Sequence, residues 1–416
     1  MTSMSRITSR AVSIGLVAMT VAACSASAPP PSVAKGTAAA SPTAFVTAIP
    51  SPTEIMTAAA SPTGTAALPL TPAPSGSWVG RFVATGSMTT PRHSHTAVRL
   101  ADGRVLILGG SSGQADTDAE LPNCEVYDPR TGSFAATGTL SHTSYKYRTY
   151  LLPNGRVLVA DAHDLDFIVD EEYDPATGRF LAVQPFAISG GSAVSALSDG
   201  RLLIMGGVTK APNYSFLATA IIYDPATGRS TRTGSMHTPR SGADAILLKD
   251  GRVLVMGGPD PSAEVYDPAT GTFSETGSMG QMRALESIVL LQDGRVLLAG
   301  GLLGSGWSQN AADAEIYDPG TGRFIPTGSM SLARDNAQAT LLADGRVLVL
   351  AGALDRAGLA YGEVYDPRAG TFSRTSPLGT TRMLPTATAL QNGNVLITGG
   401  SGPGDKILSS AELFEP

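Results

Sequence analysis

The amino-acid sequence predicts an all-β fold in which one unit of four antiparallel strands occurs seven times. Three observations predict it. The segment AEVYDPATGTF (263–273) recurs in variant forms, an Asp-Gly-Arg or similar turn recurs in register with it, and 47 glycines are available for tight turns. Repetition at a period of this length indicates one supersecondary unit used many times, and many short strands joined by tight turns are typical of all-β folds.

The Tyr-Asp-Pro segment predicts the third strand of each unit and the turn that follows it. Six full copies span 124–134, 170–180, 220–230, 263–273, 314–324 and 362–372, and a shortened copy, AELFEP, ends at Pro416. Each full copy runs from an apolar strand into a Pro-x-x-Gly turn, and in five of them the next strand opens on Phe. We expect the Tyr and Phe side chains to pack between neighbouring units, because aromatic rings bury large areas in protein cores.

The Asp-Gly-Arg turn predicts the hairpin between the first and second strands. Its arginine recurs at spacings of 43 to 52 residues, with Asn394 in the seventh copy, at Arg104, Arg156, Arg201, Arg252, Arg295 and Arg346. A strand such as DAILL (244–248) precedes the turn, and an apolar strand such as RVLVMGG (252–258) follows it. Asp-Gly or Asn-Gly between two apolar runs is a strong hairpin signal, because the turn needs residues with positive φ.

The fourth strands indicate how the fold closes. Only six of them follow the seven sets of first, second and third strands, and the segment RFVATGSM (81–88), which resembles TFSETGSM (272–279), precedes the first set. We therefore expect residues 81–88 to pair with residues 409–414, because an open ring would expose unpaired strand edges. Four antiparallel strands per repeat describe a propeller blade, so the sequence predicts a seven-bladed β-propeller closed by an N-terminal outer strand.

The repeats also carry a resemblance to a known family. Gly-Gly after the second strand, Tyr in the third and an aromatic residue in the fourth resemble kelch repeats, and the two turns resemble the galactose-oxidase-like branch. The resemblance covers residues 77–416 and implies a kelch-type β-propeller with four antiparallel strands per blade. The chain departs from the pattern in using Phe where kelch repeats favour Trp, and Asp161-Ala162 replaces Gly-Gly in blade two.

The N-terminal residues predict export and a lipid anchor. Arg6 and Arg10 accompany an apolar stretch (11–23) that has signal-peptide length and is too short to span a bilayer. The stretch ends in VAAC (21–24), which resembles a bacterial lipobox. This resemblance implies that Cys24 is lipid-modified and anchors an exported protein of the bacterial cell envelope to the outer surface of a membrane. Ordinary secretory cleavage near residues 26–28, with loss of Cys24, is the alternative.

Residues 25–76 predict a disordered stalk between the signal peptide (1–24) and the propeller (77–416). Ala, Pro, Ser and Thr dominate the segment, and the triplet SPT starts at Ser41, Ser51 and Ser61. Such a composition cannot bury a core and favours extended, polyproline-like conformations. The stalk would hold the propeller away from the membrane.

Charge and cysteine content exclude several classes of protein. The formal net charge is −6 and no basic run occurs, so the electrostatic footprint of a nucleic-acid-binding protein is missing. Cys24 and Cys124 cannot form a disulfide framework, and we expect Cys124 to be a lone buried thiol. We expect a monomer that carries no cofactor.

The main candidate site is a ring of arginines at one end of the propeller. Connections between second and third strands vary in length at this end, and variable loops on a rigid scaffold often carry function. Twelve residues before the hairpin arginine, Ser144 and Ser189 stand in two blades, and arginines stand in the other five: Arg92, Arg240, Arg283, Arg334 and Arg382. Such a ring would suit an anionic ligand. Alternatively, each arginine pairs with a neighbouring acid, such as Asp244, Glu286 or Asp335, and seals contacts between blades.

A second group of candidates gathers in the first two blades. His93, His95, Tyr145 and Tyr147 are expected near the channel mouth, where they could bind a ligand, ligate a metal or shuttle protons. Alternatively, the histidines bond to adjacent backbone. Trp307 lies on a long loop, where it could stack on a sugar ring or cap a blade. We expect no metal site, because the acidic segments lack an ordered spacing of calcium ligands.

The family resemblance raises the possibility of a copper radical site. Such a site implies two Tyr and two His ligands, with one ligand from a separate C-terminal domain, whereas this chain ends in the last blade. The ligand Tyr would fall two residues after the ring arginine, and those positions hold Ser94, Lys146, Gly191, Gly242, Leu285, Asn336 and Leu384. The sequence therefore predicts no copper oxidase activity.

Two functions remain open at the level of the sequence. The leading interpretation is a surface-tethered module that binds an unidentified protein or glycan. The alternative is a carbohydrate-active enzyme, such as a sugar epimerase or lyase, that uses Arg, His and acidic residues at the channel mouth. Fold alone does not decide between them.

Overall fold

The computed structural model describes residues 78–113, 119–143, 147–161, 166–209, 214–284, 286–304, 309–354 and 357–416. These residues belong to one compact unit. Their regular structure is antiparallel β-strand, apart from one 3₁₀ turn, η1 (Pro403–Asp405). Within this part of the chain, no helix combines the length and hydropathy needed to cross a membrane.

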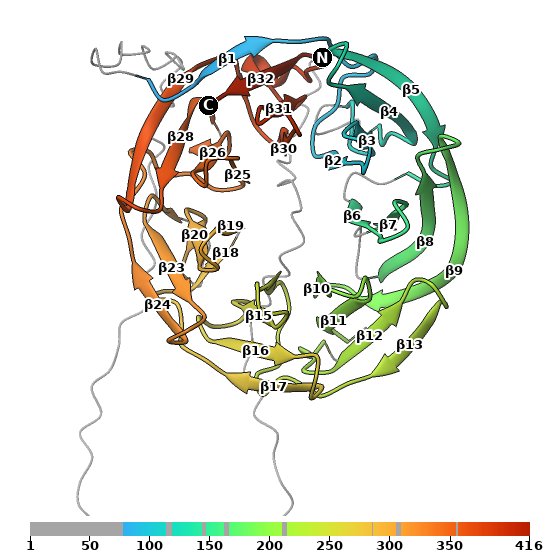
Figure 1. Ribbon diagram of the computed structural model, residues 1–416, viewed down its shortest axis with the longest axis vertical. Helices are drawn as coiled ribbons and strands as arrows, with labels where there is room; N and C mark the ends of the chain where they lie inside the picture. Colours follow the sequence, from blue (N-terminus) through green and yellow to red (C-terminus); the bar gives the residue numbers. More distant parts are fainter. Residues whose placement is uncertain are drawn as a thin grey trace, which may run out of the picture. The chain divides into compact units, whose positions relative to one another are not determined.

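The strands form sheets that follow one another around a ring, with the strand that precedes each Asp-Gly-Arg or similar turn nearest the centre (Figure 1). Five four-stranded sheets follow in chain order. The first contains β2 (Thr96–Arg99), β3 (Val105–Leu108), β4 (Asn123–Asp128) and β5 (Ser133–Thr139), and the second contains β6 (Tyr147–Leu151), β7 (Val157–Asp161), β8 (Asp166–Asp174) and β9 (Arg179–Ser189). The third contains β10 (Ser192–Ala196), β11 (Leu202–Gly206), β12 (Ala220–Asp224) and β13 (Arg229–Arg232), the fourth contains β14 (Asp244–Leu247), β15 (Val253–Met256), β16 (Ala263–Asp267) and β17 (Thr272–Glu275), and the fifth contains β19 (Ser287–Leu290), β20 (Val296–Ala299), β23 (Ala314–Asp318) and β24 (Arg323–Pro326).

Three further sheets complete the described residues. A five-stranded sheet contains β25 (Gln338–Leu341), β26 (Val347–Leu350), β28 (Ala357–Asp366) and β29 (Thr371–Arg382), with β27 (Ala353–Leu354) beside β28. A small sheet contains β18 (Arg283–Ala284), β21 (Leu302–Leu303) and β22 (Gln309–Asn310). The last sheet contains β30 (Thr386–Ala389), β31 (Val395–Thr398), β32 (Ala411–Glu415) and β1 (Arg81–Ala84).

Pairing of the two chain ends closes the ring, as the sequence predicted. β1 pairs antiparallel with β32, with Arg81 opposite Glu415 and Ala84 opposite Glu412. The Arg81 guanidinium also lies 2.7 Å from the Glu415 carboxylate. Beyond the strand, the backbone N–H of Met88 donates to the carbonyl oxygen of Ser409 at 2.9 Å, so the association continues in the predicted register. The all-β ring fits a galactose-oxidase-like β-propeller.

The Asp-Gly-Arg turns form the predicted hairpins. In the turn between β14 and β15, Gly251 has a φ of 87°, a conformation that glycine adopts at no steric cost. The Asp250 carboxylate accepts hydrogen bonds from the backbone N–H and the Nε of Arg252, at 3.1 and 2.8 Å. The side-chain hydrogen bond from Arg252 lowers the pKa of Asp250.

Because the strands are antiparallel, these turns and the Pro-x-x-Gly turns share one end of the ring, here called the hairpin end. The connections between second and third strands lie at the opposite, loop end.

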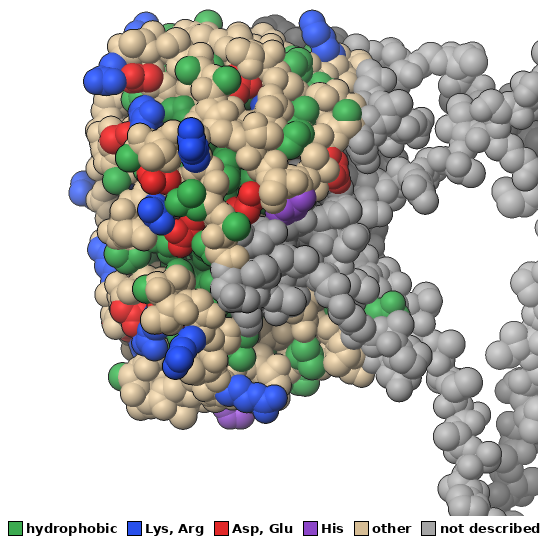
Figure 2. Space-filling view, turned by 90° about the vertical axis from the view of Figure 1, so that its right-hand side faces the viewer, with side chains coloured by type: hydrophobic (Ala, Val, Ile, Leu, Met, Phe, Trp, Pro, Cys, Tyr) green, Lys and Arg blue, Asp and Glu red, His purple; other side chains and the backbone are tan. Residues whose placement is uncertain are grey.

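The hydrophobic core lies between neighbouring sheets. Ala193, Leu203 and Met205 of one sheet cluster with Val253 and Val255 of the next. Second strands are completely buried, because both of their faces are covered by adjacent sheets. On the face shown in Figure 2, side chains of both charges lie interspersed with hydrophobic ones.

The repeated Tyr and Phe residues join each sheet to the one before it, which confirms their predicted packing. The rings of Tyr266 and Phe273 are 4.8 Å apart, and the Tyr266 hydroxyl lies 2.7 Å from Oγ1 of Thr233 in the preceding sheet. Gly234 follows that threonine, and its N–H donates to the Gly271 carbonyl oxygen at 2.9 Å. A Cβ at Gly234 would lie 2.4 Å from the same oxygen, so the repeated Thr-Gly pair is explained by close approach of neighbouring sheets.

Candidate functional site

The five predicted ring arginines are buried at the loop end of five sheets. Their exposed fractions are 0 or 1%, which makes them the largest fully buried side chains of the described residues together with several tyrosines. In each case Nη1 donates to the carbonyl oxygen of the residue that follows the second strand, and these acceptors are Gly109, Gly257, Gly300, Ala351 and Gly399. Each guanidinium group therefore binds the backbone at the point where the second strand ends and the connection to the third strand begins.

A glutamate of the third strand neutralises each of these arginines. The Nη2–Oε1 distances lie between 2.8 and 3.4 Å for the pairs Arg92–Glu125, Arg240–Glu264, Arg283–Glu315, Arg334–Glu363 and Arg382–Glu412. A buried charge is tolerated in a protein interior when it is paired and hydrogen-bonded. The five pairs meet that condition.

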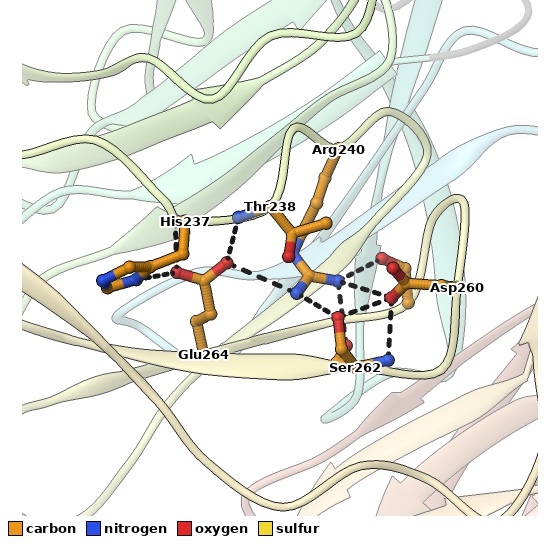
Figure 3. Close-up of polar contacts among 7 residues, drawn as sticks. His237, Thr238, Arg240, Asp260, Ser262 and Glu264 are labelled. Atoms are coloured by element: carbon orange, nitrogen blue, oxygen red, sulfur yellow. Dashed lines mark hydrogen bonds and ion pairs between the residues drawn. The ribbon is translucent and has the colours of Figure 1, made fainter. Parts of the chain in front are cut away.

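Figure 3 shows one complete pair, in the sheet β14–β17. Arg240 donates to the carbonyl oxygen and the hydroxyl of Ser262, at 2.8 and 2.7 Å, and lies 3.7 Å from Asp260. Glu264 accepts the backbone N–H groups of His237 and Thr238 at 2.7 and 3.0 Å. Burial alone would raise the pKa of Glu264, but these N–H donors and His237 outweigh it, so the pKa lies below its ordinary value.

These contacts correct the sequence-based interpretation of the ring. We expected either a rim of accessible guanidinium groups or pairing with Asp244, Glu286 or Asp335. The arginines are instead inaccessible, and their partners come from the third strand, because the arginine side chain reaches across the end of the second strand. A sequence signal for the true partner exists: glutamate stands two residues before the repeated aromatic residue in every sheet that has the arginine.

Two sheets lack the arginine. In the repeat that forms β10–β13 the corresponding residues are Ser189, at the end of β9, and Ile221, so both members of the pair are replaced. In β6–β9, Ser144 takes the place of the arginine, whereas Glu171 keeps the place of the glutamate and is 5% exposed. The Glu171 carboxylate accepts the backbone N–H of Ser141 at 3.1 and 3.3 Å, and among the described residues no arginine lies within ion-pair distance of it.

The histidines of the first sheet lie at the junction with the last sheet. His95 is 6% exposed, and its Nε2 lies 2.8 Å from Oγ1 of Thr398 and 3.2 Å from Oγ1 of Thr386. Burial, reinforced by the positive charges of Arg92 and Arg382, lowers the pKa of His95 well below its ordinary value. His95 is therefore a neutral, buried residue that links the first sheet of the ring to the last one.

Two other members of this group, His93 and Tyr147, bond to neighbouring groups of their own repeats. His93 is half-buried, with its Nδ1 3.0 Å from Ser94 Oγ and its Nε2 3.4 Å from the Gly113 carbonyl oxygen. Tyr147 is buried and donates its hydroxyl to the carbonyl oxygen of His142. Tyr145, Trp307 and Cys24 lie outside the described residues.

Cys124 is a buried free thiol, as expected. Burial raises its pKa to about 12, so the thiol is protonated and unreactive at neutral pH. It packs among Leu106, Leu108 and Leu140, in the core between the first two sheets.

Two carboxyl groups that sequence reasoning assigned to the arginines form a separate pair. Asp244 starts β14 and Glu286 immediately precedes β19, so both lie at the loop end of inner strands in neighbouring sheets. Burial, followed by the negative charge of Asp244, raises the pKa of Glu286 to about 8. Burial also raises the pKa of Asp244, and the charge of Arg148 opposes that shift. The negative charge of one of these carboxyl groups thus disfavours ionisation of the other.

The described residues do not fit a copper centre. They contain no group of three or more His, Cys, Asp or Glu side chains that could hold a metal ion. The described positions two residues after the ring arginines are Ser94, Gly242, Asn336 and Leu384, none of which is a strong copper ligand.

Comparisons with known proteins support the fold. No protein-family model matches the chain, and no curated protein matches it. Among solved structures, it is similar to a novel fungal alcohol oxidase with catalytic diversity among the AA5 family, solved in complex with copper. The TM-score is 0.64 at 20% sequence identity, over 82% of this chain and 76% of that chain. At this identity the likeness concerns the fold alone, and it agrees with a galactose-oxidase-like β-propeller.

Proposed function

We propose that this chain is a seven-bladed kelch-type β-propeller that binds a protein or glycan ligand at its loop end. The sequential four-stranded sheets, the closure of the ring by β1 and the likeness to an AA5 structure support the architecture. The buried ion pairs support a rigid scaffold, because in five sheets each pair joins the segment before the inner strand to the third strand at the loop end.

The observation that carries the binding proposal is a pair of exposed aromatic residues on the connection between β11 and β12. Tyr214 and Phe216 are 41 and 43% exposed. The backbone holds this connection in place, because the Leu217 N–H donates to the Gly207 carbonyl oxygen at 2.8 Å and the Arg240 N–H donates to that of Leu217 at 2.9 Å. Exposed aromatic rings on a rigid support are typical of binding surfaces, since they supply a large contact area at a small entropy cost. Sequence reasoning missed these two residues, because the sequence of their loop has no counterpart in the corresponding loops of the other repeats.

A glycan array probed with the exported chain tests the proposal directly. The double variant Tyr214→Ala/Phe216→Ala should lose the glycan signal that the unchanged chain gives. Ile325→Ala is the matched control, because Ile325 is 50% exposed on the outer strand β24, away from the loop end. An array signal that survives in the double variant and disappears in the control would contradict this placement of the binding surface.

We also propose that the propeller is tethered to the outer surface of a bacterial membrane through lipidated Cys24. The apolar stretch that ends at this cysteine and the Pro- and Thr-rich segment that follows it support the proposal. Cys24→Ser should release the protein from the membrane fraction into the soluble one. Membrane association that is unchanged in this variant would contradict the anchor.

A second function, carbohydrate epimerase or lyase activity, is favoured by the carboxyl pair. Glu286, whose pKa is raised to about 8, is a candidate proton donor, and Asp244, at the start of an inner strand in the neighbouring sheet, is a candidate base. Incubation of the chain with a panel of uronic and sialic acids tests this function. Conversion of one of them should be abolished in Glu286→Gln, whereas the array signal of the binding module should remain.

A further inference from the structure

The register of the sheets places seven residues at equivalent positions around the hairpin end of the ring. Each is the last residue of an inner strand and pairs with the first residue of the second strand, as Leu247 pairs with Val253. These seven positions, here called the collar, hold Arg99, Leu151, Ala196, Leu247, Leu290, Leu341 and Ala389. The collar is therefore apolar except for one arginine.

Two collar residues, Arg99 and Leu151, are exposed, and the other five are partly buried. Inner strands form the central edge of each sheet (Figure 1), and none of the seven residues is fully buried. Leu151 is 44% exposed, which is unusual for a leucine on a strand of the inner ring. An open cavity of about 500 Å³ lies here, and its lining includes Arg99, Leu151, Leu341 and Ala389 of the collar, with Ala97 and Ala387 beside them.

Arg99 differs from the arginines of the Asp-Gly-Arg turns. The arginines of the Asp-Gly-Arg turns pair with the aspartate of their own turn, as Arg252 does with Asp250 at 2.6 Å. Arg99 is exposed and donates one hydrogen bond, from Nη1 to the Ala389 carbonyl oxygen at 3.1 Å. Among the described residues, no carboxylate lies within ion-pair distance of it. The remaining donors of its guanidinium are thus available at the wall of this cavity, whose lining mixes leucine and alanine side chains with Thr340, Thr388 and Gln391.

We propose that the collar binds a carboxylic acid with an apolar chain. The leucines and alanines of the collar contact the chain, and the Arg99 guanidinium binds the carboxylate through a charge-assisted pair of hydrogen bonds. A planar guanidinium matches the two oxygens of a carboxylate, and burial of the apolar chain adds affinity through the hydrophobic effect. This site lies at the opposite end of the ring from the aromatic pair, so it is independent of the proposed protein or glycan binding.

Titration calorimetry with two probes of equal chain length, decanoate and decanol, tests the proposal. The exported chain should bind decanoate more tightly than decanol. Arg99→Gln should weaken decanoate binding at least about tenfold, because a hydrogen bond between charged groups is lost, and should leave decanol binding unchanged. Leu151→Ser should weaken binding of both probes.

The matched control is Arg130→Gln, which removes an exposed arginine of the hairpin end that pairs with Asp128 at 2.8 Å. It should leave the binding of both probes unchanged. Melting temperatures of all variants should stay close to that of the unchanged chain, because the replaced side chains are exposed. Absence of decanoate binding, or equal decanoate affinity in Arg99→Gln and the unchanged chain, would overturn the proposal.

Discussion

Two neighbouring sheets, β14–β17 and β10–β13, follow the same repeat, yet only the first contains a buried ion pair. In β14–β17, Arg240 and Glu264 are both 1% exposed and are joined at 3.4 Å. In β10–β13 the same positions hold Ser189 and Ile221, a small polar and an apolar residue. These two sheets show that the repeat tolerates a complete pair and also the absence of both members.

This difference agrees with the energetics of buried charge. Taking a guanidinium and a carboxylate out of water costs several kcal/mol per ion, and their mutual attraction offsets that cost only when both are present. Replacing both groups by uncharged residues is often nearly neutral, whereas removing one leaves an uncompensated charge. The sheet β6–β9, with Glu171 and without the arginine, stands between these cases.

The largest expected effect follows from breaking the pair in β14–β17. Arg240→Ala should lower the free energy of unfolding by about 3–5 kcal/mol, because Glu264 then remains buried without its cation. Urea unfolding at pH 7 measures this loss. The exposed Arg252→Ala, in the hairpin of the same sheet, is the control and should cost no more than about 1 kcal/mol. Equal losses in the two variants would mean that burial of the pair is irrelevant to stability.

The double variant Arg240→Ser/Glu264→Ile reproduces in β14–β17 the residues of β10–β13. It should be more stable than Arg240→Ser alone, with an interaction energy of at least about 2 kcal/mol in a double-mutant cycle. The cycle is measured by urea unfolding of the four proteins. Strictly additive losses would show that the two sheets differ for reasons unrelated to the ion pair.

Acidification should weaken the junction between the first and last sheets. The pKa of His95 in the folded chain is well below the value near 6.5 expected when it is unfolded, so the unfolded chain binds more protons once the pH falls below about 6.5. Stability should then decrease by up to about 1.4 kcal/mol per pH unit below that value and be independent of His95 above it.

Thermal unfolding of His95→Gln between pH 5 and pH 8 checks this dependence. The variant should lose less stability on acidification than the unchanged chain, because glutamine does not titrate. His237→Gln is the control, since His237 is exposed and faces Glu264, and it should retain the steep decrease of the unchanged chain. Parallel pH profiles for the unchanged chain and His95→Gln would argue against a neutral buried His95.

Much of the fold could be predicted from the sequence because it repeats. The turns of Asp250 and Arg252, the third strand with Tyr266 and the closing strand 81–88 recur often enough to define one unit. The site was harder to predict, because partners such as Arg240 and Glu264 are set by how a long side chain crosses a neighbouring strand. Tyr214 and Phe216 lie outside the repeat, so no other copy indicated their exposure.

The smallest expected effect concerns Glu171, the buried carboxylate whose sheet has Ser144 in place of an arginine. Glu171→Gln should change the free energy of unfolding by no more than about 1 kcal/mol, because the amide oxygen can still accept the Ser141 N–H. Glu264→Gln should cost about 3 kcal/mol, since it leaves the buried Arg240 without a counter-charge. Urea unfolding of both variants makes the comparison within one protein. If the two losses were equal, a cation outside the described residues would serve Glu171, and β6–β9 would belong with the sheets that contain a complete pair.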